Sequence, residues 1–179
     1  MRGHNAIRVE LYGQLVQDWN LSKSVWQFAA SLTSLGNVYH SLGEYQQAIE
    51  RHQQSLAISE EIGDRSGEGG SLCNLGNAYK SLGEYQQAKE LYQKALPILR
   101  ETHHRQFEAN TLMGLGDVYR SLGQYQQARE YHQQSLEIFE EIGDHLGIAG
   151  SLMGLGIAYD SLGQHQRAIE YHQQSLEIC

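Results

Sequence analysis

Histidine is the residue type in this sequence that most readily suggests metal binding or catalysis, because the chain has nine of them. His52, His132 and His172 recur at multiples of forty residues, and His103 and His104 form an adjacent pair. Zinc needs every ligand nitrogen at about 2.0–2.1 Å, whereas equivalent residues on successive packed helices lie roughly 10 Å apart. We therefore interpret the recurring histidines as core residues that replace an aromatic side chain, and the adjacent pair as part of a solvated loop.

Other patterns that support catalysis or cofactor binding are missing from the sequence. It has no dinucleotide, phosphate-binding, metalloprotease or serine-hydrolase motif in a suitable setting. Cys73 and Cys179 lie 106 residues apart without a neighbouring ligand pattern, which predicts neither a disulfide framework nor a zinc ribbon. Glu60 and Glu61 are predicted to lie on the solvent side of a helix end. We expect no enzymatic activity, no catalytic or metal site and no cofactor.

The chain is acidic, with 13 Lys and Arg residues against 21 Asp and Glu residues and a formal net charge of −8. Binding the phosphate backbone of DNA or RNA needs basic residues that displace counterions, so we expect no nucleic-acid partner. No segment approaches the roughly 18 apolar residues of a membrane span, and Arg8 and Glu10 interrupt the apolar stretch that a signal peptide needs. We expect a cytoplasmic protein that does not bind membranes.

An internal repeat organises most of the chain. The string SLGEYQQA at residues 41–48 returns at 81–88, then as SLGQYQQA at 121–128 and as SLGQHQRA at 161–168. The period is therefore forty residues, and four copies occupy roughly residues 24–179. Such a period is typical of repeat proteins in which each copy is one supersecondary unit.

Each repeat has the pattern of two antiparallel helices. Apolar residues recur at helical spacing in its first half: Leu32, Leu35, Tyr39 and Leu42. Gly43 is predicted to end this helix in a left-handed conformation. A second helix then runs from Tyr45 to Ile62, and Asp64 is predicted to cap the next helix through its side chain.

A single helical hairpin cannot bury its apolar face alone, so neighbouring hairpins must stack. We predict an all-α fold, a right-handed α-solenoid of about nine helices. One of them is an N-terminal helix over residues 5–20 that covers the first repeat. The expected units are 1–23 for this packing helix and 24–63, 64–103, 104–143 and 144–179 for the repeats, the last ending within its second helix.

The residues of the second repeat carry a resemblance to a known family. They are Leu72, Leu75, Gly76, Tyr79, Ala88, Tyr92 and Ala95. The chain resembles tetratricopeptide repeat proteins, with a forty-residue period in place of the family's usual 34. Leu35-Gly36-Asn37 makes it similar to the Leu-Gly-Asn repeat adaptors, and it is also similar to bacterial tetratricopeptide arrays. The resemblance implies a protein-binding scaffold in which the first helix of each repeat lines a concave groove.

We predict that the non-core positions of these first helices bind a partner. They are Thr33, Asn37, His40, Cys73, Asn77, Lys80, Asn110, Met113, Asp117, Arg120, Met153 and Ile157. Lys80 and Arg120 are expected to form a paired cationic spot, whereas Met153 and Ile157 make the last repeat apolar. A peptide with an acidic residue followed by apolar ones would fit this stripe, and the pattern leaves open whether it binds as a helix or an extended segment.

The leading functional hypothesis is a non-enzymatic protein–protein interaction module that holds a peptide segment of a partner in the groove. Two alternatives remain open: a self-assembling structural array, and a fragment of a larger bacterial regulatory or sensor protein. The final residues repeat the internal pattern instead of forming a polar capping helix. We therefore expect homo-oligomerisation through the surface around Ile169, Leu176 and Ile178.

Overall fold

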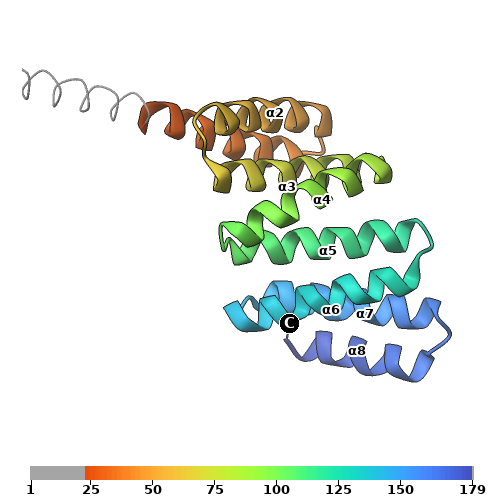
Figure 1. The fold of residues 1–179 in the computed structure, drawn as a ribbon. Helices are drawn as coiled ribbons and strands as arrows, with labels where there is room; N and C mark the ends of the chain where they lie inside the picture. The colour runs from red at the N-terminus through yellow and green to blue at the C-terminus, as the bar shows by residue number, and fades with distance from the viewer. Residues whose placement is uncertain (1–22, 179) are drawn as a thin grey trace, which may run out of the picture.

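The computed structural model describes residues 23–178, and within this range it is all helical, without a strand (Figure 1). The first helical segment covers residues 23–41, hereafter helix 23–41. It is followed by α2 (Tyr45–Glu61), α3 (Arg65–Ser81), α4 (Tyr85–Glu101), α5 (Arg105–Ser121), α6 (Tyr125–Ile142), α7 (His145–Ser161) and α8 (His165–Ile178). The predicted all-α solenoid of antiparallel helix pairs is confirmed. The ninth helix, expected over residues 5–20, lies outside the described residues.

The turns between helices follow the residues that the repeat supplies. Gly43 adopts a φ of 78°, a left-handed value that glycine reaches without a steric cost. Asp64 and Asp144 cap α3 and α7, because each side chain accepts a hydrogen bond from the backbone N–H three residues later, at 2.9 and 3.1 Å. Sequence chemistry therefore sets where each helix stops and the next one starts.

The helices stack in chain order, and two kinds of helix occupy different sides of the array. We call helix 23–41, α3, α5 and α7 the A helices, and α2, α4, α6 and α8 the B helices. Successive A helices contact each other, as α3 does α5 and α5 does α7, whereas no such contact joins two of the described B helices. Because successive A helices contact each other and the B helices do not, we call the side lined by the A helices the inner face of the array.

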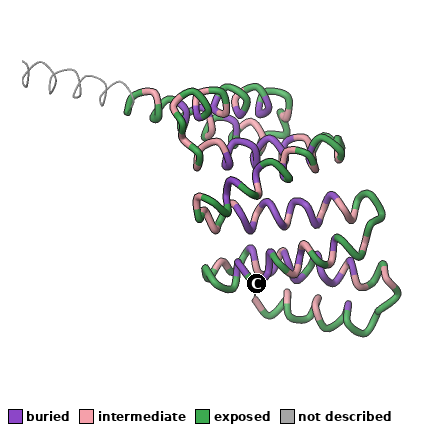
Figure 2. The backbone as a smooth tube through the Cα atoms, viewed as in Figure 1, coloured by how far each residue is buried: buried purple, intermediate pink, exposed green. Residues whose placement is uncertain are grey.

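Aromatic side chains from the B helices fill slots that glycines leave in the A helices. Tyr92 lies between Gly76 and Gly114, where an added Cβ would come within 2.6 and 2.5 Å of its ring. His132 occupies the matching slot one repeat later, and its exposed fraction is only 1%. His52 is equally buried, whereas His172 is partly exposed. Figure 2 shows the buried residues running along the contacts between stacked helices.

The interpretation of the recurring histidines as core residues is confirmed for His52 and His132. Each ring packs against a glycine of its own repeat, Gly36 and Gly116 respectively. The surrounding apolar groups are continuous from repeat to repeat, with buried clusters that join residues of adjacent hairpins. The core therefore runs through the contacts between hairpins and leaves the inner face of the A helices uncovered.

Candidate functional site

The inner face carries the predicted binding residues with one exception. All of them except Cys73 are at least partly exposed. The Cys73 side chain is fully buried beside Tyr92 and Leu115, and burial raises the pKa of its thiol to about 11. The prediction that Cys73 lines the groove was wrong, because its position on α3 faces α5 and is covered by it.

The two cations that were expected to form a free pair are instead joined through one carboxylate. Lys80 Nζ lies 2.7 Å from Asp117 Oδ2, and Arg120 lies 3.8 Å from Asp117 Oδ1. Asp117 therefore offsets one of the two positive charges. Asp117 was among the predicted groove residues, but the spacing does not show that its carboxylate lies between the two cations. The local charge offers less attraction to an acidic ligand than the sequence predicted.

Several polar residues of the inner face bind other parts of the array. Tyr92 donates its hydroxyl hydrogen to Asn77 Oδ1 over 2.7 Å. Thr33 shares a hydrogen bond of 2.8 Å with Ser55 on α2. These bonds hold the side chains in fixed orientations, so this part of the face is organised before any ligand binds.

The inner face of α7 is apolar and exposed. Met153 exposes 52% of its surface, and Leu146 on the first turn of the same helix is more exposed still. Ile157 is partly exposed on the helical turn after Met153. Gly150 leaves room for Met113 of the preceding A helix, whose Sδ would lie 3.3 Å from an added Cβ. Leu146 was missed by the sequence analysis, although it follows the capping residue Asp144 in the repeat pattern.

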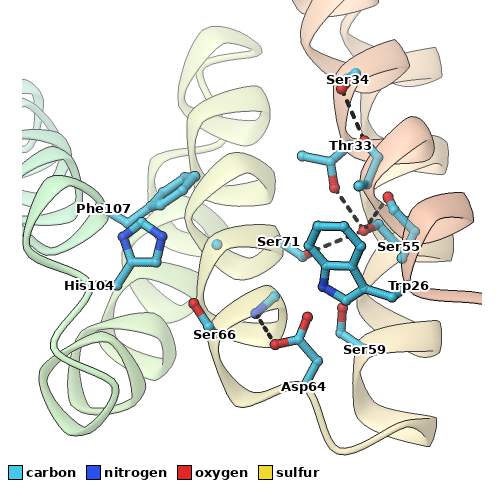
Figure 3. A pocket seen from close by; sticks show the side chains of 14 residues that line it. Trp26, Thr33, Ser34, Ser55, Ser59, Asp64, Ser66, Ser71, His104 and Phe107 are labelled. Carbon is cyan, nitrogen blue, oxygen red and sulfur yellow. Dashed lines mark hydrogen bonds between the residues drawn. The ribbon is translucent and has the colours of Figure 1, made fainter. Parts of the chain in front are cut away.

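An open cavity of about 490 Å³ lies at the other end of the inner face, across the first turns of α3 (Figure 3). One wall is Trp26 of helix 23–41, and Phe107 with His104 of the α5 segment lies across α3 from it. The full lining is Trp26, Ala29, Ala30, Thr33, Ser34, Ser55, Ser59, Asp64, Ser66, Gly67, Gly70, Ser71, His104 and Phe107. Among the predicted site residues only Thr33 is part of it, so most of this cavity was missed.

The described residues hold neither a metal-binding cluster nor a membrane-spanning helix. Within residues 23–178 no group of three or more His, Cys, Asp or Glu side chains is arranged to hold a metal ion. None of the helices in that range is long and apolar enough to cross a membrane. The stacked helix pairs, with a partly apolar inner surface and an open cavity at one end, define a repeat scaffold of the α-solenoid class.

Comparison with known proteins identifies the family. The sequence profile of the tetratricopeptide repeat matches residues 27–101 and 107–179. The chain therefore belongs to the tetratricopeptide repeat family. No curated protein matches the sequence.

Several solved structures share the fold. BtubC from P. vanneervenii is 20% identical with a TM-score of 0.74, over 94% of this chain and 74% of that protein. Repeats of a putative kinesin light chain from Podospora anserina are 25% identical with a TM-score of 0.65, over 98% and 91%. A Rap protein complexed with Competence and Sporulation Factor is 18% identical with a TM-score of 0.79, over 86% of this chain but only 43% of that protein.

Proposed function

We propose that this chain is a non-enzymatic interaction module whose inner face binds a peptide segment of a partner protein. The observation that carries the proposal is the exposed inner face of the A helices, which combines the open cavity at one end with the apolar surface of Met153 at the other. Membership of the tetratricopeptide repeat family supports a role as a protein-binding scaffold. The acidic net charge supports a protein partner over a nucleic acid, and we place the protein in the cytoplasm.

Replacing Met153 by Glu should weaken peptide binding at least about tenfold, because a charge would have to be desolvated against an apolar ligand surface. Met153 is half exposed, so we expect the fold to remain intact. The measurement is the affinity of the full chain for peptides of about twelve residues that are selected on it from a random library. Gln93→Glu is the matched control, because Gln93 is exposed on the B helix α4 and receives the same charge.

Equal affinities in the two variants would contradict the proposal. Selected peptides that lose affinity only with Gln93→Glu would place the binding surface on the outer side of the array. Melting temperatures of both variants separate an effect on binding from an effect on folding.

A second candidate function is self-assembly into a longer array, and the exposure of two helix faces favours it. In helix 23–41, Leu35 and Val38 are exposed, whereas the equivalent Leu75 of α3 is buried against the preceding B helix. In α8, Leu176 is 76% exposed, whereas the equivalent Leu136 of α6 is buried against the following A helix. A second copy could stack α8 on helix 23–41 and reproduce the internal contact between hairpins.

We expect sedimentation velocity to show association of the wild-type chain as its concentration rises. Leu176→Glu should shift the chain to monomer, because the new charge would be buried in the stacked contact. A wild-type chain that stays monomeric at high concentration would exclude this candidate without affecting the peptide-binding proposal.

A further inference from the structure

The cavity on the inner face exists because one core side chain is short in the first half of the array. Ser59, Leu99 and Phe139 occupy the same position in three successive repeats. Leu99 and Phe139 are fully buried: Leu99 packs against Gly69 of α3, and Phe139 packs on Gly147 of the next A helix, α7. Ser59 is also buried, with 2% of its surface exposed. Its side chain is shorter than those of leucine and phenylalanine, and it lines the cavity. Its hydroxyl makes no hydrogen bond within the described part of the chain.

A second difference between the two halves leaves a carboxylate oxygen free. Asp144 accepts a hydrogen bond at Oδ1 from the Gly147 N–H, and its Oδ2 accepts another from Gln106 Nε2 at 2.8 Å. The bond from Gln106 is the main reason that the pKa of Asp144 lies below its usual value. The hydrogen bond between Gln106 and Asp144 shows that Oδ2 of a capping aspartate can accept a hydrogen bond from a donor on the inner face.

Asp64 lies eighty residues before Asp144 and caps α3 in the same way. The position equivalent to Gln106 is occupied by Trp26. Asp64 Oδ1 accepts from the Gly67 N–H at 2.9 Å. Asp64 Oδ2 has no donor among the described residues. It lies 2.4 Å from the point where a Cβ on Gly67 would be, and Ser59 Oγ lies 2.7 Å from the same point. The two unpartnered acceptors are therefore neighbours at the bottom of the cavity.

The chemistry of the walls indicates which group would satisfy these acceptors. The lining contains the carboxylate of Asp64 but no Lys or Arg, so an acidic ligand would meet a like charge. Trp26 and Phe107 offer aromatic surface on which a planar cation can stack. Arginine combines a planar cationic group with several N–H donors, whereas the lysine ammonium is a compact, strongly hydrated point charge.

We propose that this cavity binds an arginine side chain of the partner segment, with its guanidinium on Asp64 and Ser59 and its flat face against Trp26. The inference rests on the proposed function, because the arginine belongs to the segment that the inner face binds. Gly67 and Gly70 also line the cavity, and the missing Cβ of Gly67 leaves the space in which Asp64 Oδ2 and Ser59 Oγ lie. The ligand class is therefore a peptide with an arginine, followed toward α7 by apolar residues.

The test uses peptides selected on the full chain from the random library. We expect arginine to be enriched among them at one position. Asp64→Asn should weaken these peptides about tenfold, because a hydrogen bond to a charged group is lost while Asn can still cap α3 through its side-chain oxygen. Ser59→Phe should also weaken them, since it fills the cavity as Phe139 does in the other half. Asp144→Asn is the matched control and should leave the affinity unchanged.

The outcomes separate this inference from the proposed function. The arginine site would be overturned if the selected peptides lack arginine. It would also be overturned if Asp64→Asn leaves their affinity unchanged while Met153→Glu lowers it. Either result would leave groove binding intact. If neither Asp64→Asn nor Met153→Glu changes the affinity of the peptides, both the arginine site and the proposed function are overturned. A selection that yields no binder would have the same consequence. Replacing the arginine of a selected peptide by phenylalanine should reduce its affinity, and an equal or higher affinity would mean that the cavity binds an apolar side chain instead.

Discussion

Lowering the pH from 7 to 4 should destabilise the array by about 3 kcal/mol for each of two buried histidines, His52 and His132. Burial lowers the pKa of both side chains from 6.5 to about 4, since the charged imidazole loses its hydration. For His52, a nearby His40 lowers the pKa further. For His132, the nearby Asp117 raises the pKa, whereas Arg120 and Lys80 lower it.

The direction of this pH effect follows from the protonation of the two histidines in the folded and unfolded states. The folded array keeps both histidines neutral, whereas the unfolded chain protonates them below a pKa of 6.5. Above that value the two states bind the same number of protons and the histidines do not affect stability. Between pH 6.5 and about 4 the unfolded state binds more protons, so the free energy of unfolding falls as the pH is lowered.

Urea unfolding at pH 7, 5.5 and 4 measures this effect. His132→Phe should reduce the dependence of the unfolding free energy on pH by roughly one histidine's share, because phenylalanine fits the slot that Tyr92 fills in the second repeat. The control is Tyr92→Phe, which alters the matching slot of the second repeat without removing a histidine and should leave the pH dependence as it is in the wild type. An identical pH dependence in wild type and His132→Phe would show that His132 has the same pKa in the folded array as in the unfolded chain, and would contradict the prediction.

Replacing Phe139 by Ala should cost about 3–5 kcal/mol of stability. The ring is fully buried between α6 and α7, in a cluster with Leu112 and Ile138, and it packs directly on Gly147. Its removal opens a cavity in the contact between the third and fourth hairpins. Stability in a repeat array depends on such contacts between neighbours, so the loss should appear in equilibrium unfolding.

Ser59 provides a matched control for this substitution, because it occupies the equivalent position in the first repeat. Ser59→Ala should change stability by less than about 1 kcal/mol, since it removes one oxygen without a hydrogen bond and creates no new large cavity. Equal losses for Phe139→Ala and Ser59→Ala would mean that the two positions are packed alike. That result would remove the explanation given for the cavity beside Ser59.

The repeat pattern was sufficient to predict the helix pairs and their stacking. A left-handed glycine follows the first helix of every hairpin, as Gly43 does, and aspartate caps α3 and α7, whereas His103 and His104 replace the Gly-Asp pair before α5. Apolar spacing also identified much of the buried face, such as Leu32, Leu72 and Leu75, although Leu35 and Leu42 of the same pattern are exposed in the first repeat. These features are local, because turn conformation, capping and amphipathic spacing are determined within a few residues.

The details of the inner face could not be predicted from the same pattern. Cys73 differs in burial from Asn77 and Lys80, the other predicted groove residues of α3, because the next A helix covers it. The spacing within one repeat does not show how far that cover extends. The Lys80–Asp117 ion pair joins residues of adjacent repeats across a contact whose geometry the sequence does not specify. The cavity was in principle detectable, because Ser59 stands where the other repeats have Leu99 and Phe139.

Photo-crosslinking of a selected peptide to the full chain tests the central claim most directly. Two versions of the peptide would carry a benzophenone side chain, one near each end, and mass spectrometry would identify the residues that each version modifies. If the inner face is the binding surface, adducts should form on the A helices, with sites near Trp26 and Met153 at opposite ends of the peptide. Adducts confined to the outward surfaces of α2, α4, α6 and α8 would contradict the account.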